Sequence, residues 1–372
     1  MNKILIVLLF CFAPGSLFAQ YEDPELKVLL FDTNAPFTIS SASGFQVRQI
    51  AELRGKKKVT ITPYRGGGAK FGRIRYKGKS VVIRSKSTLW IRRAGHKAHK
   101  YAGTLEIVPH KKGVYLINHI RTESYLEGVL GAEIKTTWPM AAVKAQAVIA
   151  RTYALYRRFE RKRSLWHLRA STGDQVYLGL EVSGPRARFA IEGTRGVVVS
   201  YQGRLAKTFY HANCGGMTED PGMVWSYSFP YYQVTEVPFG TEDPKYEWEV
   251  RLDRRQLEGI ARKLGLRRQR LQGLEVSQRT NSGRAHKINF LGRKQQSVRA
   301  NEFRRVVGYT KIKSLMFEIT ETDRGVLISG QGSGHGVGLC QWAAKEMGDQ
   351  GYSYQEILHF FYKPIDLGYY QG

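Results

Sequence analysis

The sequence has few cysteines, no long apolar run beyond its N-terminus, and no acidic residue in one basic segment. Three cysteines in 372 residues exclude a disulfide-rich scaffold, and none of them forms the paired spacing of a zinc finger. After the N-terminus, no segment reaches the about 18 consecutive apolar residues that indicate a membrane-spanning helix. A hydrophobic content of 42% indicates a packed globular protein rather than a disordered one.

The N-terminus has the pattern of a secretory signal. Lys3 supplies the positive charge, residues 4–13 form the apolar core, and Ala19 is a small residue suited to cleavage. We therefore predict a signal peptide over residues 1–19 and export to the periplasm or the cell-wall space, with no transmembrane span in the mature chain. An uncleaved anchor is the alternative.

Two cysteines, Cys214 and Cys340, stay in the chain once the signal is removed. Exported proteins meet oxidising conditions, and an even, small number of cysteines there favours a disulfide. The sequence therefore predicts one disulfide, and two unrelated free thiols are the alternative.

The net charge of +27 is concentrated in the first third of the chain. Residues 54–100 contain sixteen Lys and Arg and no Asp or Glu. For an exported protein this charge favours acidic polymers outside the cytoplasm over nucleic acid. Such polymers are cell-wall glycan with its peptide carboxylates, lipopolysaccharide and teichoic acid. A solvated basic face that only aids solubility is the alternative.

Residues 330–342 read GQGSGHGVGLCQW, with glycine at every second position from Gly330 to Gly338. The run matches no phosphate-binding loop, dinucleotide fingerprint or nucleophile elbow. Because glycine lacks a Cβ, two readings are open. The run is either a tight backbone crossing or a wall that lets a bulky ligand approach the main chain.

The periodicity of apolar residues predicts an α+β protein with a β-rich N-terminal part and a small helical core. The first helix of that core reads SYLEGVLGAE, with a predicted capping box of Ser124 and Glu127. A second helix starts near Pro139. The predicted regions after the signal are a β-rich basic segment (20–120), a helical core with a second motif block (121–245), an inserted α+β region (246–330), and a glycine-rich closing motif with a C-terminal helix (331–372).

Glu133 continues the apolar stripe of the first helix, which contains Leu126, Val129 and Leu130. A carboxylate at such a position loses hydration, which raises its pKa and suits it to act as a general acid. An ion pair with Lys135 or another cation at the helix end is the alternative. Ordinary glycoside hydrolysis requires a second carboxylate, but one suffices if the sugar supplies its own nucleophile.

Four motif blocks, in order, resemble the stage II sporulation protein D family, also called the SpoIID/LytB or amidase-enhancer family. The resemblance covers nearly the whole mature chain. The blocks are SYLEGVLGAEIKTTWPMAAVKAQAVIARTYAL; FYHANCGGMT followed by VW and PYYQV; SGRAHKINF with KIKSLMFEI; and GSGHGVGLCQWAAKEMGDQGYSYQEILHFFY.

The resemblance implies a peptidoglycan lytic transglycosylase, which cleaves the MurNAc–GlcNAc bond without water and leaves 1,6-anhydro ends. The catalytic acid of the family falls on Glu133. Some family members are amidase modifiers rather than enzymes, so a non-catalytic wall-binding protein that activates an amidase is the alternative.

The resemblance also implies a glycan groove walled by the glycine run. His335 and Gln341 would offer polar contacts there, although a structural role for His335 is an open alternative. Arg151, Tyr153 and His211 are the other candidate substrate-binding residues. No cofactor is expected, but zinc-binding relatives make a site of His211, Cys214, His335 and Cys340 the alternative to the Cys214–Cys340 disulfide.

Overall fold

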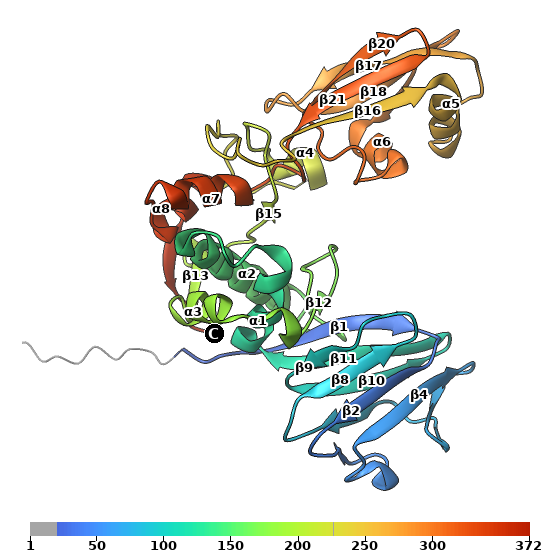
Figure 1. The fold of residues 1–372 in the computed structure, drawn as a ribbon, viewed down its shortest axis with the longest axis vertical. Coiled ribbons are helices and arrows are strands. Elements are labelled where there is room, and N and C mark those ends of the chain that lie inside the picture. The colour runs from blue at the N-terminus through green and yellow to red at the C-terminus, as the bar shows by residue number, and fades with distance from the viewer. Residues whose placement is uncertain (1–20, 226) are drawn as a thin grey trace, which may run out of the picture.

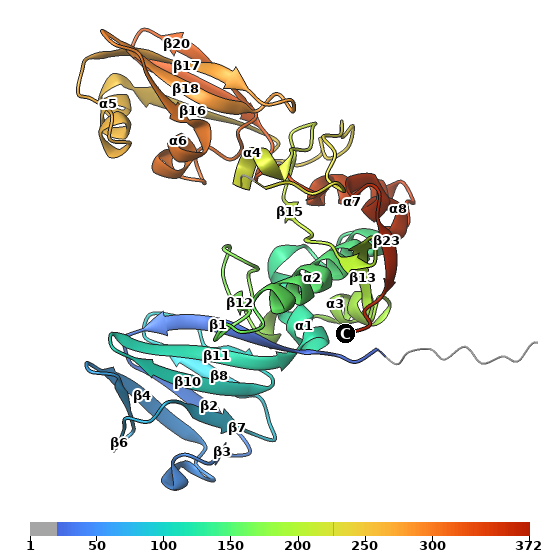
Figure 2. The same cartoon turned by 180° about the vertical axis from the view of Figure 1, so that it is seen from behind.

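The computed structural model describes residues 21–225 and 227–372, so the predicted signal peptide lies outside the described residues. Within these two ranges, no helix combines the length and apolarity needed to cross a membrane. A β-rich part lies at one end of the molecule, a group of helices in the middle, and a second part made of strands and two helices at the other end (Figures 1 and 2).

The β-rich part consists of two six-stranded sheets whose inner faces share one core. Buried Ile39 and Ile61 come from one sheet, and buried Ile83 and Leu105 come from the other. The first sheet has the order β12 (Leu168–Arg169), β1 (Glu25–Thr33), β11 (Gly113–Arg121), β10 (Thr104–His110), β7 (Val81–Arg84), β3 (Gln46–Val47). The second has the order β6 (Ile74–Tyr76), β5 (Gly68–Phe71), β4 (Lys58–Tyr64), β2 (Phe37–Ser41), β8 (Leu89–Arg93), β9 (His99–Tyr101). A 3-10 turn, η1 (Ala51–Leu53), follows β3.

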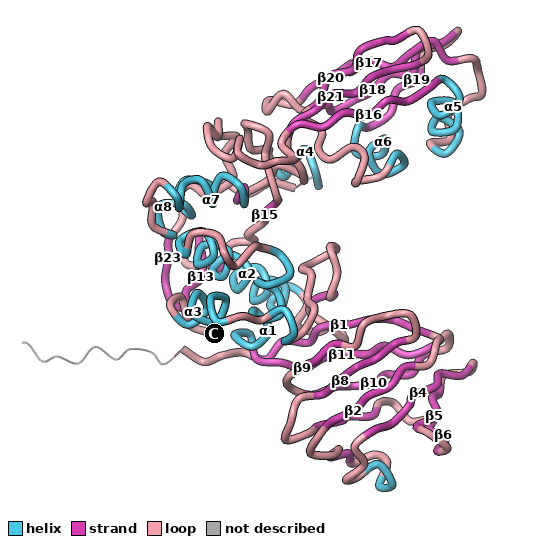
Figure 3. The backbone as a smooth tube through the Cα atoms, in the orientation of Figure 1, coloured by secondary structure: helices cyan, strands magenta, loops and turns pink. Residues whose placement is uncertain are grey.

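The helical middle is built around α2, which packs against four other helices. Its many alanines allow these neighbours to approach closely, and Figure 3 shows the helices gathered there. The helices of this part are α1 (Thr122–Glu133), α2 (Met140–Glu160), α3 (Pro185–Glu192), α4 (Pro221–Trp225), α7 (Gln341–Asp349) and α8 (Tyr354–Phe361), with the 3-10 turn η2 (Leu180–Val182). The short strands are β14 (Arg204–Leu205), β13 (Val197–Tyr201) and β23 (Asp366–Tyr369) in one sheet, and β15 (Tyr210–His211) parallel to β22 (Leu339–Cys340).

The predicted capping box of Ser124 and Glu127 is wrong, because α1 begins two residues earlier, at Thr122. The cap comes instead from a distant part of the chain. The backbone N–H of Glu123 donates to a carboxylate oxygen of Asp23 at 3.2 Å, which satisfies one of the free donors of the first turn. A local sequence pattern cannot anticipate a cap that tertiary structure supplies.

The third part of the molecule, residues 247–331, has its own hydrophobic core, which includes Leu257, Ile288, Phe303 and Ile328. We call it the part with the separate core. Together with the β-rich and helical parts it confirms the predicted α+β class. Its sheets are β16 (Glu247–Asp253), β21 (Gly325–Gln331) and β20 (Phe317–Thr322), and β17 (Leu271–Arg279), β18 (Ala285–Gly292) and β19 (Gln296–Arg299). Its helices are α5 (Arg254–Lys263) and α6 (Ala300–Val307).

Candidate active site

Glu133 is the last residue of α1, and its half-buried carboxyl group is held by two donors. The backbone N–H of Val176 donates to Oε1 of Glu133 at 2.6 Å. The hydroxyl of Tyr210, on β15, also hydrogen-bonds to this carboxyl group. Gln175 donates in turn to the Tyr210 hydroxyl at 3.4 Å. The carboxyl group therefore has a fixed orientation supported by residues from two other segments.

Burial raises the pKa of Glu133 above the ordinary glutamate value, and the hydrogen bonds from Val176 and Tyr210 offset part of this rise. The apolar stripe that leads to Glu133 is buried, as the helical spacing predicted. Within the described ranges, no ion pair involves Glu133, and the Lys135 ammonium instead lies 5.7 Å from the centre of the Trp342 ring. The ion-pair alternative is therefore wrong, and the raised pKa is confirmed in direction.

Gln341 supports the end of α1 from the closing motif. Its side-chain amide donates to the backbone carbonyl of Glu133 at 2.9 Å and to Oε1 of Gln146 at 3.2 Å. The C-terminal carbonyls of a helix have no partner within it, so this bond fixes the residue that carries the carboxyl group. Next in the chain, Trp342 packs against Trp138 with ring centres 4.8 Å apart. Gln341 thus positions Glu133.

Two candidate substrate-binding residues of α2 are engaged in the interior. Arg151 is fully buried and forms a two-pronged ion pair with Glu123, with both N–O distances at 2.8 Å. The expectation that Arg151 contacts substrate is wrong, because no atom of its side chain reaches the surface. Tyr153 is 7% exposed and donates its hydroxyl proton to Asp174 at 3.1 Å.

The predicted Cys214–Cys340 disulfide is wrong: both cysteines are buried free thiols. The two residues do lie side by side, since the backbone N–H of Cys214 donates to the sulfur of Cys340 at 3.2 Å. His211 joins them, and the ligand atoms of the three residues lie within 4.8 Å of one another. Cysteine number and compartment indicated a pair, but they carry no information on the histidine beside it.

This three-residue cluster fits a zinc ion by its donor chemistry. Nδ1 of His211 lies 3.1 Å from the carbonyl oxygen of Val337, which leaves the buried Nε2 without a hydrogen-bond partner in the described chain. Burial also lowers the pKa of His211, which favours the neutral imidazole that binds metals. His335, the fourth member of the set inferred from sequence, lies outside the cluster, and its Nδ1 accepts from the Val337 N–H at 3.0 Å.

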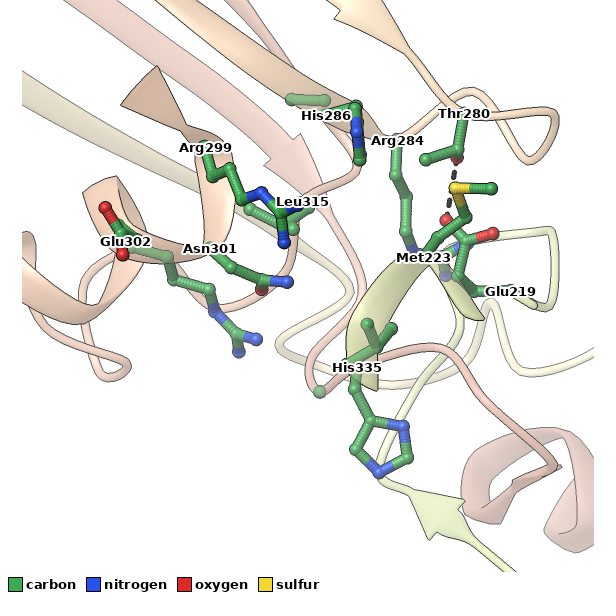
Figure 4. Close-up of a pocket in the computed structure, with 14 residues that line it drawn as sticks. Glu219, Met223, Thr280, Arg284, His286, Arg299, Asn301, Glu302, Leu315 and His335 are labelled. Atoms are coloured by element: carbon green, nitrogen blue, oxygen red, sulfur yellow. Dashed lines mark hydrogen bonds between the residues drawn. The ribbon is translucent and has the colours of Figure 1, made fainter. Parts of the chain in front are cut away.

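The glycine run is a tight backbone crossing at its centre. Gly336 and Gly338 have φ of 83° and 71°, a region that favours glycine. A Cβ on Gly336 would collide with the Arg284 guanidinium, and one on Gly338 would collide with the carbonyl oxygen of Phe209. The expected groove wall is therefore wrong at these two positions, because they face protein atoms. His335 does line a cavity, shown in Figure 4.

Sequence reasoning missed Tyr210 and Val176, the two donors to Glu133. Tyr210 directly precedes His211 in the FYHANCGG block, so its place in a motif block was the one available signal. Val176 acts through its backbone, and its side-chain identity therefore gives no indication of the role.

Two family models match the chain. Residues 110–201 match the model described as Stage II sporulation protein (SpoIID), and residues 235–338 match a domain of unknown function (DUF8618). The first match contains Glu133, and the second contains all strands and helices of the part with the separate core.

Three curated relatives cover much of the chain. An uncharacterised protein of Brachyspira hyodysenteriae is 28% identical over 95% of both chains. The amidase enhancer of Bacillus subtilis is 28% identical over 65% of this chain and 40% of that protein. Stage II sporulation protein D of Bacillus amyloliquefaciens is 24% identical over 68% of this chain and 75% of that protein. Together with the ordered motif blocks, these matches show that the chain is similar to proteins of the SpoIID family.

Proposed function

We propose that this protein is an exported peptidoglycan lytic transglycosylase, which cleaves the MurNAc–GlcNAc bond of glycan strands and leaves 1,6-anhydro-MurNAc ends. The matches to stage II sporulation protein D and to an amidase enhancer support a cell-wall-related function. The observation that carries the specific proposal is Glu133, a half-buried carboxyl group with a raised pKa, fixed hydrogen bonds and no ion pair within the described ranges. Export rests on the N-terminal signal pattern.

In this mechanism Glu133 acts first as an acid and then as a base. The neutral carboxyl group donates its proton to the glycosidic oxygen as the bond to the anomeric carbon breaks. The resulting carboxylate takes the proton of the 6-hydroxyl group of MurNAc, whose oxygen attacks the same anomeric carbon. Glu133 returns to its neutral form, and no water is consumed. The donors from Val176 and Tyr210 stabilise the carboxylate between the two steps.

Mass analysis of the products tests this proposal. Pure protein incubated with isolated glycan strands should release fragments that end in 1,6-anhydro-MurNAc, which are one water lighter than hydrolysed fragments. Intact strands, or fragments with ordinary reducing ends, would contradict it.

A non-catalytic activator of a cell-wall amidase is the second candidate, and the similarity to an amidase enhancer favours it. This function predicts no change in glycan strands from the protein alone, but faster release of stem peptides when an amidase is added. The same incubations, run with and without an amidase, separate the two candidates.

The second sheet of the β-rich part offers a basic surface for binding to the cell wall. Lys58, Trp90 and Arg92 line a shallow hollow across β2, β4 and β8, and Trp90 is 39% exposed. Exposed charges are screened beyond about 8 Å at physiological ionic strength. Binding to isolated sacculi in a sedimentation assay should therefore weaken as salt is added.

Reversal of charge at this surface should weaken sacculus binding further. We expect Lys58→Glu with Arg92→Glu to lower the bound fraction more than Arg267→Glu with Arg268→Glu, an equal charge change in the other β-containing part. Equal losses would indicate that only net charge matters, and binding that is insensitive to salt would contradict an electrostatic role.

We also propose that His211, Cys214 and Cys340 hold a zinc ion. Two thiolates and a neutral imidazole are ligands that zinc prefers, and the ion would tie the second motif block to the closing run. Metal analysis of the purified protein should find about one zinc per chain, and Cys214→Ser or His211→Gln should lose it. His335→Gln is the matched control and should keep the metal, because His335 lies outside the cluster. Wild-type protein that takes up no zinc when it is supplied would contradict the site.

A further inference from the structure

A cavity of about 170 Å³ lies where the part with the separate core meets the second motif block. Arg284, the residue before β18, and Arg299 and Arg304, from β19 and α6, line it on one side. His335 of the glycine run lines it from the other side. In Figure 4 the side chains of Arg284, Arg299 and Asn301 approach the same space, with His335 below them.

Arg284 is a buried cation with one hydrogen-bond donor that has no partner among the described residues. It is 2% exposed, and its Nη atoms donate to Ser282 at 2.9 Å and to the backbone carbonyls of Cys214 and Met217 at 2.5 and 2.8 Å. Its Nε–H is buried and has no hydrogen-bond partner within the described residues. An unused donor on a buried charge costs stability unless a ligand satisfies it.

The cavity contains more positive than negative charge. Arg304 donates to the backbone carbonyls of Ile312 and Lys313, and no ion pair is formed by it or by the other two arginines among the described residues. Two acidic residues also line the cavity. The Glu219 carboxylate already accepts from Thr280, from Ser282 and from the backbone of Asp220, and the exposed Glu302 carboxylate points away from Arg284 (Figure 4).

The pKa of Arg304 also indicates that positive charge in the cavity is not balanced by negative charge. Burial lowers the pKa of Arg304 to about 10, and the nearby charge of Arg284 contributes to this. An anion in the cavity would stabilise the charged arginines.

We infer that this cavity binds a carboxylate group of the cell-wall glycan strand. This inference rests on the proposed function, which supplies the substrate. A guanidinium fork matches a planar carboxylate, and the volume suits a small group rather than a sugar ring. The cavity is also linked to Glu133, because His335 hydrogen-bonds to the backbone of Tyr210, whose hydroxyl bonds to the Glu133 carboxyl group.

Two sources supply such a carboxylate. In a peptide-free strand it is the lactyl group of MurNAc, and in a peptide-bearing strand it belongs to the stem peptide.

Arg299 is the cavity arginine that we choose for substitution, because it is exposed and caps no helix through its side chain. Arg305, an exposed arginine of α6 outside the cavity lining, is the matched control.

Calorimetric titrations with glycan tetrasaccharides test the inference. The probes are the peptide-free form, the peptide-bearing form, and each form with its carboxylates converted to methylamides. The protein is the full chain with Glu133→Gln, alone or combined with Arg299→Gln or Arg305→Gln. For at least one probe, blocking the carboxylates should weaken binding about tenfold or more, and Arg299→Gln should cause a similar loss.

The loss of affinity caused by blocked carboxylates and the loss caused by Arg299→Gln should not add, because each change removes the same interaction. The probe that shows this behaviour identifies the source of the carboxylate, and Arg305→Gln should bind like the parent. Losses that add fully, or binding unaffected by blocked carboxylates, would overturn the inference. Because binding is measured without turnover, this outcome is independent of whether 1,6-anhydro products are formed.

Discussion

Glu133→Gln should abolish glycan cleavage while the protein stays folded. The amide has nearly the shape of the carboxyl group, and its oxygen can still accept the hydrogen bond from the Val176 N–H. It cannot donate an acidic proton or accept one back, so both steps lose their catalyst. General acid–base catalysis contributes about 10²–10⁴-fold, and we expect at least this loss in the rate of anhydro-product formation.

Glu127→Gln is the matched control for this prediction. Glu127 lies on the same helix, but its carboxylate accepts from the Ser183 hydroxyl at 2.6 Å, away from the Glu133 donors. Its substitution should leave turnover nearly unchanged. Unchanged turnover in Glu133→Gln would remove Glu133 from the mechanism, and a loss in both variants would indicate damage to α1 rather than to an acid.

The pH dependence of activity should follow the raised pKa of Glu133. Only the neutral carboxyl group can protonate the leaving oxygen, so the rate should fall as the pH rises through that pKa. Stability shifts in the same direction. A carboxyl pKa that is higher in the folded than in the unfolded chain makes folding less favourable as the pH rises through this interval. Glu133→Gln should lose this part of the pH dependence of unfolding.

Features set by local periodicity could be predicted from the sequence. The stripe that ends at Glu133 follows from helical spacing, and the resulting rise in its pKa follows from burial alone. The α+β class followed from the change between two-residue and helical periods. The alternating glycines indicated that the backbone needs space, and the crossing at Gly336 and Gly338 confirms one of the two readings.

Features set by long-range contacts could not be predicted. The cap of α1 comes from Asp23, one hundred residues before Glu123. The resemblance named His211, Cys214, His335 and Cys340 as an alternative ligand set, but only the fold brings the first, second and fourth together and leaves His335 outside. The Arg284 cavity forms only where residues 219–224 of the second motif block meet residues 280–335. In each case the chemistry depends on which segments meet in space, and residue spacing along the chain does not encode this.

Arg151 illustrates the same limit, since a motif position suggested substrate binding where the structure has a buried ion pair. Besides its two bonds to Glu123, Arg151 donates to the backbone carbonyls of Val197 at 3.1 Å and Ile191 at 3.3 Å. It therefore connects α1 and α2 to the end of α3 and to β13. Glu123 is 5% exposed, so it would keep a buried negative charge if Arg151 were removed.

Arg151→Met should therefore lower the free energy of unfolding by about 3–5 kcal/mol, as measured by urea denaturation, because breaking a buried pair leaves one charge uncompensated. Adding Glu123→Gln should recover part of this loss, since the remaining partner is then neutral. Arg195→Met is the matched control: its pair with Glu192 is exposed, and the change should cost at most about 1 kcal/mol. If Arg151→Met instead weakens binding to glycan strands without lowering stability, the residue contacts substrate and the buried pair is not its main role.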